Sequence, residues 1–222
     1  MPRLEVEELK QTNSNSTRLN RRKSFWIGIF IVLIAAIALD TTVVRIGSEQ
    51  DVRKQVFNPD AYGQSQFPRI RDIVNERAVS AQQLAAELAT DKKLAMKTYG
   101  TPGSVGAFMP VNLTGVVGDG KSGVYNLTVD GVPDGTKIRV QTGPAINGTE
   151  LRDISGDIIF GDFKNQIEYQ DAGAGINRAM MAAVLVDLNR AKLAGSTINL
   201  VGVFNLINPK NWLITPIILE VE

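Results

Sequence analysis

The chain has 222 residues, of which 44% are hydrophobic and 21% are charged, and its formal net charge is +1. This composition is that of an ordinary globular protein, so disorder is not expected over most of the chain. A net charge so close to zero gives no long-range attraction for a polyanion, and nucleic acid is therefore not an expected partner. The sequence has neither cysteine nor histidine, which excludes thiol nucleophiles, disulfides, Cys/His metal sites and histidine-dependent triads. We predict no metal site and no cofactor.

The N-terminal part predicts a membrane-directed segment. Residues 1–24 form a polar tail that ends in a basic cluster, and residues 25–44 form a transmembrane anchor or signal segment whose apolar run is Phe25–Leu39. Positive charge ahead of such a run keeps the N-terminus in the cytoplasm. We therefore expect a single pass through a bacterial inner membrane, with the globular domain in the periplasm.

Retention or removal of this segment is a separate question. The run of about 15 residues is shorter than the about 20 that span a bilayer, although Thr41–Val44 would lengthen it. Ala36-Ile37-Ala38 satisfies the small-x-small pattern of signal peptidase, but the polar stretch ahead of the run is long for a signal peptide. We expect retention, and cleavage is the alternative.

The next part of the chain, residues 45–105, is predicted to be helical after a short piece at Thr42–Ile46 that suits a strand. X-Pro pairs at Asn58-Pro59 and Phe67-Pro68 are expected to break the helical pattern. The last helix should begin at a capping box of Ser80 and Gln83 and run to Tyr99, because Gly100 stops it. A linker is expected over residues 100–106.

Residues 106–222 are predicted to form a β-rich domain. Alternation of apolar and polar residues indicates strands around 111–117 and 125–129, joined by a turn at Gly118–Gly123, and a third strand at Thr136–Gln141. These three strands should form a meander.

The rest of this domain completes the expected fold. A loop-rich stretch with a short strand at Asp157–Phe160 leads to a helix at about Ile176–Leu193, and strands follow at Thr197–Leu206 and Trp212–Val221. Five strands with a helix between the third and fourth give an α+β protein with the connectivity of the oligonucleotide/oligosaccharide-binding (OB) barrel. Gly115 suits the sharp bend of its first strand. An open α+β sandwich with the same elements is the competing architecture.

Four stretches of the sequence carry a resemblance to a known family. They are Tyr99–Gly106, Gly143–Asp153, Gly202–Phe204 and Ile214–Pro216. Over about residues 33–222 the chain resembles a family of uncharacterised, predicted periplasmic lipoproteins of bacteria, a domain of unknown function named DUF2291. Genes of that family often stand beside sugar ABC-transporter genes, which implies a role near carbohydrate uptake. The chain departs from the family in lacking the lipid-accepting cysteine, since Leu39 and Asp40 occupy that region.

A small set of polar residues is the candidate ligand site. If the barrel forms, loops at one end of the sheet should bring them together: Arg139, Gln141, Asn147, Asn208, Lys210, Asn211 and Trp212. An indole face beside amides and a cation is what a sugar ring requires for stacking and paired hydrogen bonds. The competing interpretation is that Trp212 is a core or rim residue.

Two functions are compatible with these features. The first is a non-enzymatic binding or accessory module on the periplasmic face, with a saccharide or ABC-transporter components as partners. The second is a carboxylate-dependent hydrolase of envelope glycans, which needs two facing carboxyl groups. The densest set of acids that could supply them is Asp153, Asp157, Asp162, Glu168 and Asp171. The alternative interpretation is that these five acids are solvated residues in loops.

Overall fold

The computed structural model describes residues 25–40 and 57–222, which belong to two units, Met1–Val56 and Phe57–Glu222. In the first unit, residues 25–40 form one helix over the predicted apolar run, and its side chains are exposed. Within the described ranges, no helix combines the length and apolar character needed to cross a membrane. The strand expected at Thr42–Ile46 lies outside the described residues.

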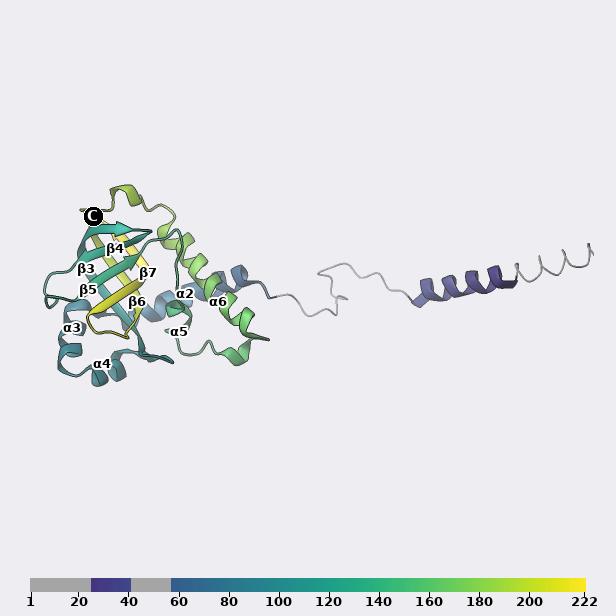
Figure 1. Cartoon of the computed structure of the whole chain (residues 1–222), viewed down its shortest axis with the longest axis horizontal. Helices are drawn as coiled ribbons and strands as arrows, with labels where there is room; N and C mark the ends of the chain where they lie inside the picture. Colours follow the sequence, from purple (N-terminus) through teal and green to yellow (C-terminus); the bar gives the residue numbers. More distant parts are fainter. Residues whose placement is uncertain (1–24, 41–56) are drawn as a thin grey trace, which may run out of the picture. The chain divides into compact units, whose positions relative to one another are not determined.

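The second unit contains helices and a sheet in one compact arrangement (Figure 1). Its helices are α2 (Pro59–Arg77), α3 (Ala81–Thr90), α4 (Lys92–Tyr99), α5 (Glu150–Asp153) and α6 (Gln166–Met180), with single helical turns at Phe160–Asp162, Met181–Leu185 and Arg190–Lys192. Its strands are β1 (Val79–Ser80), β2 (Thr101–Pro102), β3 (Ala107–Lys121), β4 (Val124–Thr128), β5 (Lys137–Gln141), β6 (Thr197–Asn205) and β7 (Asn211–Val221).

Five of these strands pair in a closed circuit. The order is β3, β4, β5, β7 and β6, and β6 pairs back onto β3. The pairing of β5 with β7 is parallel and the other four are antiparallel. This is the predicted meander followed by two strands, and α6 lies in the chain between β5 and β6, the third and fourth of the five strands in sequence order. The short strands β1 and β2 pair with β3 alongside the circuit. The protein is therefore a mixed α+β protein.

The long strand β3 holds the circuit together because it contacts two partners in succession. It pairs with β6 from Phe108 to Val116 and with β4 from Val116 onward. A Cβ atom on Gly115 would lie 2.9 Å from the carbonyl oxygen of Thr128 and 3.0 Å from a methyl of Val129. Glycine is therefore what lets β3 curve past the end of β4, as the sequence suggested.

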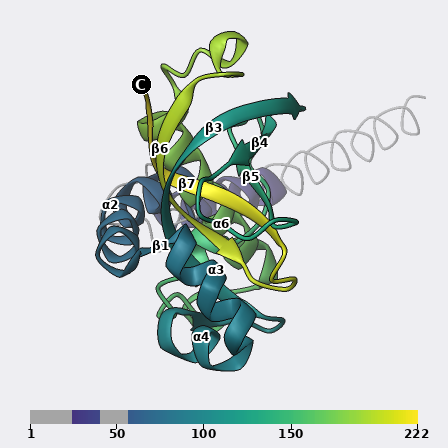
Figure 2. The same cartoon turned by 90° about the vertical axis from the view of Figure 1, so that its left-hand side faces the viewer.

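The apolar residues fill two cores. One lies inside the strand circuit and is covered by α3 and α4, which Figures 1 and 2 show beyond one end of the strands; its largest members are Phe204, Trp212, Met109 and Leu84. The other lies between α2, α6 and the outer side of β6 and β7, and includes Phe67, Ile70, Ile176, Val203 and Ile217. The two cores explain why β6 and β7 carry apolar residues on both faces.

Helix α2 begins at the first predicted break, Asn58-Pro59, but it is not interrupted at the second, Phe67-Pro68. The side chain of Asn58 accepts hydrogen bonds from the backbone N–H groups of Asp60 and Ala61, each at 3.1 Å. The predicted break at Phe67-Pro68 is wrong, because α2 continues through Pro68 to Arg77. Phe67 is buried against the second core while Pro68 is exposed, so tertiary packing maintains the helix despite the missing backbone donor.

The predicted helix from Ser80 to Tyr99 is two helices. The Ser80 hydroxyl accepts from the backbone N–H of Gln83 at 3.2 Å, which confirms the predicted start. The chain then leaves the helical conformation at Asp91, whose side chain accepts from the N–H of Leu94 at 3.0 Å and begins α4. An aspartate that caps a new helix competes with continuation of the old one.

The region from 157 to 193 differs most from the sequence-based expectation. The short strand predicted at Asp157–Phe160 is wrong, since that stretch has no strand and a helical turn follows at Phe160–Asp162. The helix predicted at about Ile176–Leu193 starts ten residues earlier, at Gln166, after a cap by Asn165, and it ends at Met180, where the turn Met181–Leu185 follows. The glycines before residue 176 therefore lie within α6 and not in a loop.

Those glycines have a packing role. A Cβ atom on Gly175 would overlap the carbonyl oxygen of Pro59, and one on Gly63 would overlap the carbonyl oxygen of Gly175. Helices α2 and α6 thus cross with their backbones in direct contact at this pair of glycines. Isolated glycine lowers helix propensity, but here it is needed for the crossing.

Candidate ligand-binding groove

A polar groove lies on the outer face of β4, β5 and β7. It has a volume of about 520 Å³ and is lined by Asn126, Gly135, Lys137, Arg139, Asn208, Lys210 and Asn211. On β5 the exposed Lys137 and half-buried Arg139 alternate with the buried Ile138 and Val140, so the two cations face outward.

Strand pairing explains why these residues meet. Arg139 is paired with Asn126 on β4, and Lys137 is paired with Asn211 on β7. Side chains at directly paired positions lie on the same face of a sheet. The connection from β6 to β7 then adds Asn208 and Lys210 at the edge of the groove.

Hydrogen bonds hold the groove in shape. Arg139 Nη2 donates to Asn211 Oδ1 at 2.8 Å, which fixes the guanidinium beside the end of β7. The backbone N–H of Lys210 donates to Asn208 Oδ1 at 2.9 Å, and the backbone N–H of Lys137 donates to the carbonyl of Lys210 at 2.9 Å. The loop is therefore tied to itself and to β5, so its polar side chains are presented from an ordered backbone.

The charge of the groove has one sign. Three cations line it, and no carboxylate is among its lining residues. In the described part of the chain, Lys137, Arg139 and Lys210 make no salt bridge, whereas Arg69, Arg152 and Arg178 each do. Arg139 Nε is enclosed and has no hydrogen-bond acceptor among the described residues.

The structure brings part of the predicted site together. Arg139, Asn208, Lys210 and Asn211 meet in the groove. Trp212 is fully buried instead: its ring stacks on Phe204 with centroids 4.6 Å apart, and its Nε1 donates to the carbonyl of Pro209 at 2.9 Å. As neighbours on a strand, residues 211 and 212 face opposite sides of the sheet.

Two further predicted residues, Gln141 and Asn147, are not among the lining residues of the groove and instead hold a loop. Gln141 is buried, and its side-chain amide donates to the carbonyl of Asn147 at 3.0 Å and to the hydroxyl of Thr215 at 2.9 Å. The backbone N–H of Asn147 donates back to Gln141 Oε1 at 3.1 Å. This pair fastens the loop after β5 over the end of that strand.

Two lining side chains, Asn126 and Lys137, were not predicted from the sequence. The sequence did indicate Lys137, because it lies two residues before Arg139 on the same strand and therefore on the same face of the sheet. Asn126 had no such signal, since its place opposite Arg139 depends on the register between β4 and β5.

The acids of residues 153–171 lie elsewhere and are used in local structure. Asp153 pairs with the buried Arg152 at 2.7 Å, and the Arg152 guanidinium also lies over the Tyr169 ring at 3.6 Å from its centroid. The hydrogen bond from Arg69 holds the pKa of the Asp157 carboxyl below its usual range. Among the described residues, no group of three or more Asp or Glu side chains has the geometry of a metal site.

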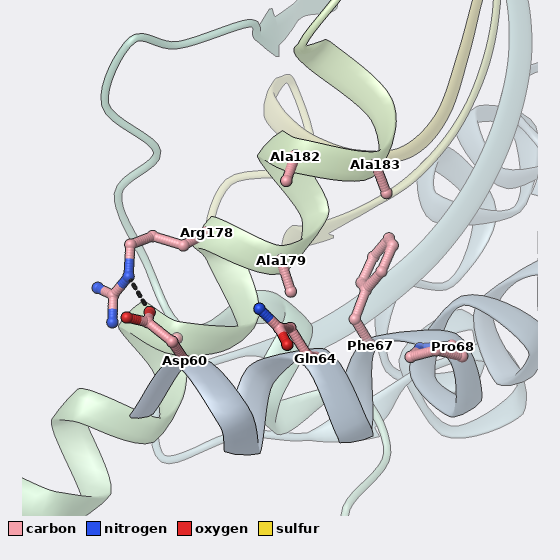
Figure 3. A pocket seen from close by; sticks show the side chains of 9 residues that line it. Asp60, Gln64, Phe67, Pro68, Arg178, Ala179, Ala182 and Ala183 are labelled. Atoms are coloured by element: carbon pink, nitrogen blue, oxygen red, sulfur yellow. Dashed lines mark hydrogen bonds and ion pairs between the residues drawn. The ribbon is translucent and has the colours of Figure 1, made fainter. Parts of the chain in front are cut away.

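A second hollow lies between α2 and α6 (Figure 3). It has a volume of about 470 Å³, and its apolar wall includes Phe67, Ala179 and Ala183. Arg178 Nε donates to Asp60 Oδ1 at 2.6 Å and joins the two helices at one end, as the dashed line in Figure 3 shows. Because its charges are paired with each other, this hollow offers less to a polar ligand than the β4–β5–β7 groove.

Comparisons with known proteins give the fold and the family. No protein with a curated description matches the sequence. The structure is similar to the crystal structure of an OB-fold protein from Thermotoga maritima, with a TM-score of 0.60 and 19% sequence identity over 76% of this chain and 100% of that one. The sequence profile of the family described as "Predicted periplasmic lipoprotein (DUF2291)" matches residues 28–220. Since that match covers most of the 222 residues, the chain belongs to this family of predicted periplasmic lipoproteins.

Proposed function

We propose that this envelope protein is a non-enzymatic binding or accessory module and that the β4–β5–β7 groove is its saccharide site. The observation that carries the proposal is the position of the groove. In the strand circuit β4 and β5 are the second and third strands, and the β6–β7 connection joins the fourth and fifth. In OB barrels the face of strands two and three and the loop between strands four and five bind oligonucleotides and oligosaccharides.

The barrel itself is part of this proposal. We infer that the closed pairing circuit is an OB barrel, with β3 as its curved first strand. The buried side chains of β3, β4, β5, β6 and β7 that meet inside it support this inference. So does the similarity to the Thermotoga OB-fold protein.

The lining residues suit sugar hydroxyls. Asn126, Asn208 and Asn211 supply amide groups that both donate and accept hydrogen bonds, and Arg139 supplies further donors. No aromatic side chain is among the lining residues, so recognition would rest on polar contacts and not on stacking.

Attachment to the inner membrane by Phe25–Leu39 is a second part of the proposal. Its support comes from the sequence: a basic cluster at Arg18, Arg21, Arg22 and Lys23 precedes the apolar run. The 222 residues contain no cysteine that could be acylated. We propose that the helix takes the place of the lipid as the tether, with the globular unit in the periplasm.

The partner that we propose is a sugar ABC transporter of the same envelope. Mild crosslinking of the full chain in membranes, followed by purification, should recover transporter components. Recovery of unrelated envelope proteins alone would count against this partnership.

A binding experiment tests the site directly. Full-length protein in detergent is titrated with a panel of envelope-derived oligosaccharides, and Asn211→Ala is compared with Asn75→Ala, an exposed asparagine of α2. Loss of the Asn211 amide also releases Arg139, so we expect about a tenfold loss of affinity for the bound sugar. Equal affinities for the two variants would place the site elsewhere.

The hydrolase alternative receives no support from the placement of its candidate acids. Asp153 and Asp157 are held in ion pairs, and Asp162 and Glu168 accept hydrogen bonds from nearby backbone N–H groups. None of the candidate acids lines the β4–β5–β7 groove.

A further inference from the structure

We infer that the ligand of the β4–β5–β7 groove is an anionic saccharide, a hydroxyl-rich chain that carries carboxylate or phosphate groups. This inference rests on the proposed function, because it names the class of ligand for the same groove.

The first reason is a local charge that the protein leaves uncompensated. Lys137 and Arg139 lie two residues apart on the outer face of β5, and Lys210 joins them through the backbone hydrogen bond between Lys137 and Lys210. The buried Arg152, by contrast, is paired with Asp153. Because the net charge of the chain is only +1, this accumulation is a feature of the groove and not of the whole surface.

The second reason is the state of Arg139. Its Nη2 donates to Asn211 Oδ1 at 2.8 Å, which orients the planar guanidinium, and no carboxylate among the lining residues neutralises its charge. An oriented guanidinium suits a carboxylate or phosphate group better than a neutral hydroxyl, because hydrogen bonds from a charged donor to an oxyanion are stronger than those to a neutral acceptor. Ordering of Arg139 before binding also lowers the entropy cost of holding such a ligand.

The third reason distinguishes a sugar from a nucleic acid. Proteins that bind single strands combine a positive groove with aromatic side chains on which bases stack. Here the lining has cations and amides but no aromatic ring, and the nearest indole, Trp212, is turned into the core. Asn126, Asn208 and Asn211 instead offer the mixed donors and acceptors that hydroxyl groups need.

The test compares probes of equal length that differ in charge. Full-length protein in detergent is titrated calorimetrically with a trigalacturonate, a phosphorylated maltotriose, neutral maltotriose and a short oligothymidine. We expect at least one of the two acidic trisaccharides to bind about tenfold more tightly than neutral maltotriose, and the stronger acidic probe identifies the carboxylate or phosphate source. The advantage should shrink between about 50 mM and about 500 mM salt, over which the Debye length falls roughly threefold.

Substitutions locate the charge effect in the groove. Lys137→Gln and Lys210→Gln should each weaken acidic binding about threefold more than they weaken neutral binding, as expected for exposed charges. Arg139→Lys keeps the charge but loses the planar fork, so we expect about a tenfold loss. Lys97→Gln, at an exposed lysine of α4, is the matched control and should have no effect.

Each remaining outcome overturns the inference in a distinct way. Equal binding of neutral and acidic trisaccharides, lost in Asn211→Ala, would refute the charge requirement and leave the proposed saccharide site intact. If no trisaccharide bound, both the charge requirement and the proposed saccharide site would be refuted. Tighter binding of oligothymidine, or acidic binding that survives all three groove substitutions, would assign the groove to another ligand or to none.

Discussion

Replacement of Gly175 by alanine should destabilise the protein, although alanine is the better helix former. Gly175 lies inside α6, where a Cβ atom would overlap the carbonyl oxygen of Pro59 on α2. The obstruction is backbone and cannot rotate away as a side chain can. The two helices would have to separate, and the core between them, which includes Phe67 and Ile176, would lose packing.

The size of the effect follows from two opposed contributions. Alanine gains about 1 kcal/mol over glycine in a helix interior. Overpacking of a close contact costs about 1–3 kcal/mol, and rigid backbone places this case at or above the upper end. We expect a net loss of about 2 kcal/mol in the free energy of unfolding, which lowers Tm by about 4–8 °C for a domain of this size.

The assay is unfolding of the full chain by heat and by urea, monitored by circular dichroism. Gly173→Ala is the matched control, because it lies on the same helix and its Cβ atom would meet its nearest neighbour, Arg152 Nη1, at an ordinary 3.7 Å. The control should raise Tm by about 2–4 °C. If Gly175→Ala were as stable as Gly173→Ala, the close crossing of α2 and α6 would be refuted.

Three further predictions concern a titrating acid, the buried indole and the topology. Burial raises the pKa of the Glu150 carboxyl above its ordinary 4.5, so the folded protein binds this proton more tightly than the unfolded chain and loses stability as pH rises through that interval. Glu150→Gln should therefore stabilise the protein more at pH 7 than at pH 4, as measured by urea unfolding, and a pH-independent difference would contradict the assignment. Trp212→Leu should lower the free energy of unfolding by roughly 2–3 kcal/mol and leave the saccharide affinity of the groove unchanged, whereas lost affinity in a fully folded variant would restore a ligand role for the indole. A reporter that is active only in the periplasm, fused after Glu222, should be active; N-terminal sequencing should find residues 25–39 retained, and a mature chain starting at Leu39 would show cleavage instead.

The order of strands could be predicted from the sequence because strand periodicity is local. The alternation in β5 and the glycines around residues 118–135 were sufficient to predict a meander, although β3 continues to Lys121, through most of the turn predicted at Gly118–Gly123. Helix boundaries in α2 and α6 were not predictable in the same way. Pro68 and Gly175 are local breakers, and tertiary packing against the second core overrides them.

The candidate site was predicted in part for a related reason. The alternation on β5 correctly places Arg139 on the outer face, and the same rule, applied to β7, puts Asn211 and Trp212 on opposite faces. We predicted both neighbours at one ligand, although strand geometry allows only one of them to reach it. Gln141 lies two residues after Arg139 and so on the same outer face of β5, yet the loop that returns through Asn147 covers it. Loop placement of this kind has no local signal.

Register is the property on which the groove depends most. Lys137 meets the end of β7 only because the parallel pairing of β5 with β7 sets it opposite Asn211, more than seventy positions away in the sequence. A slip of one residue would bring Trp212 outward and turn Asn211 into the core, which would bury an amide and expose an indole. The stacking of Trp212 on Phe204 and its bond to Pro209 oppose that slip. A buried apolar side chain at position 212 therefore helps to fix the register that places Asn211 beside Arg139.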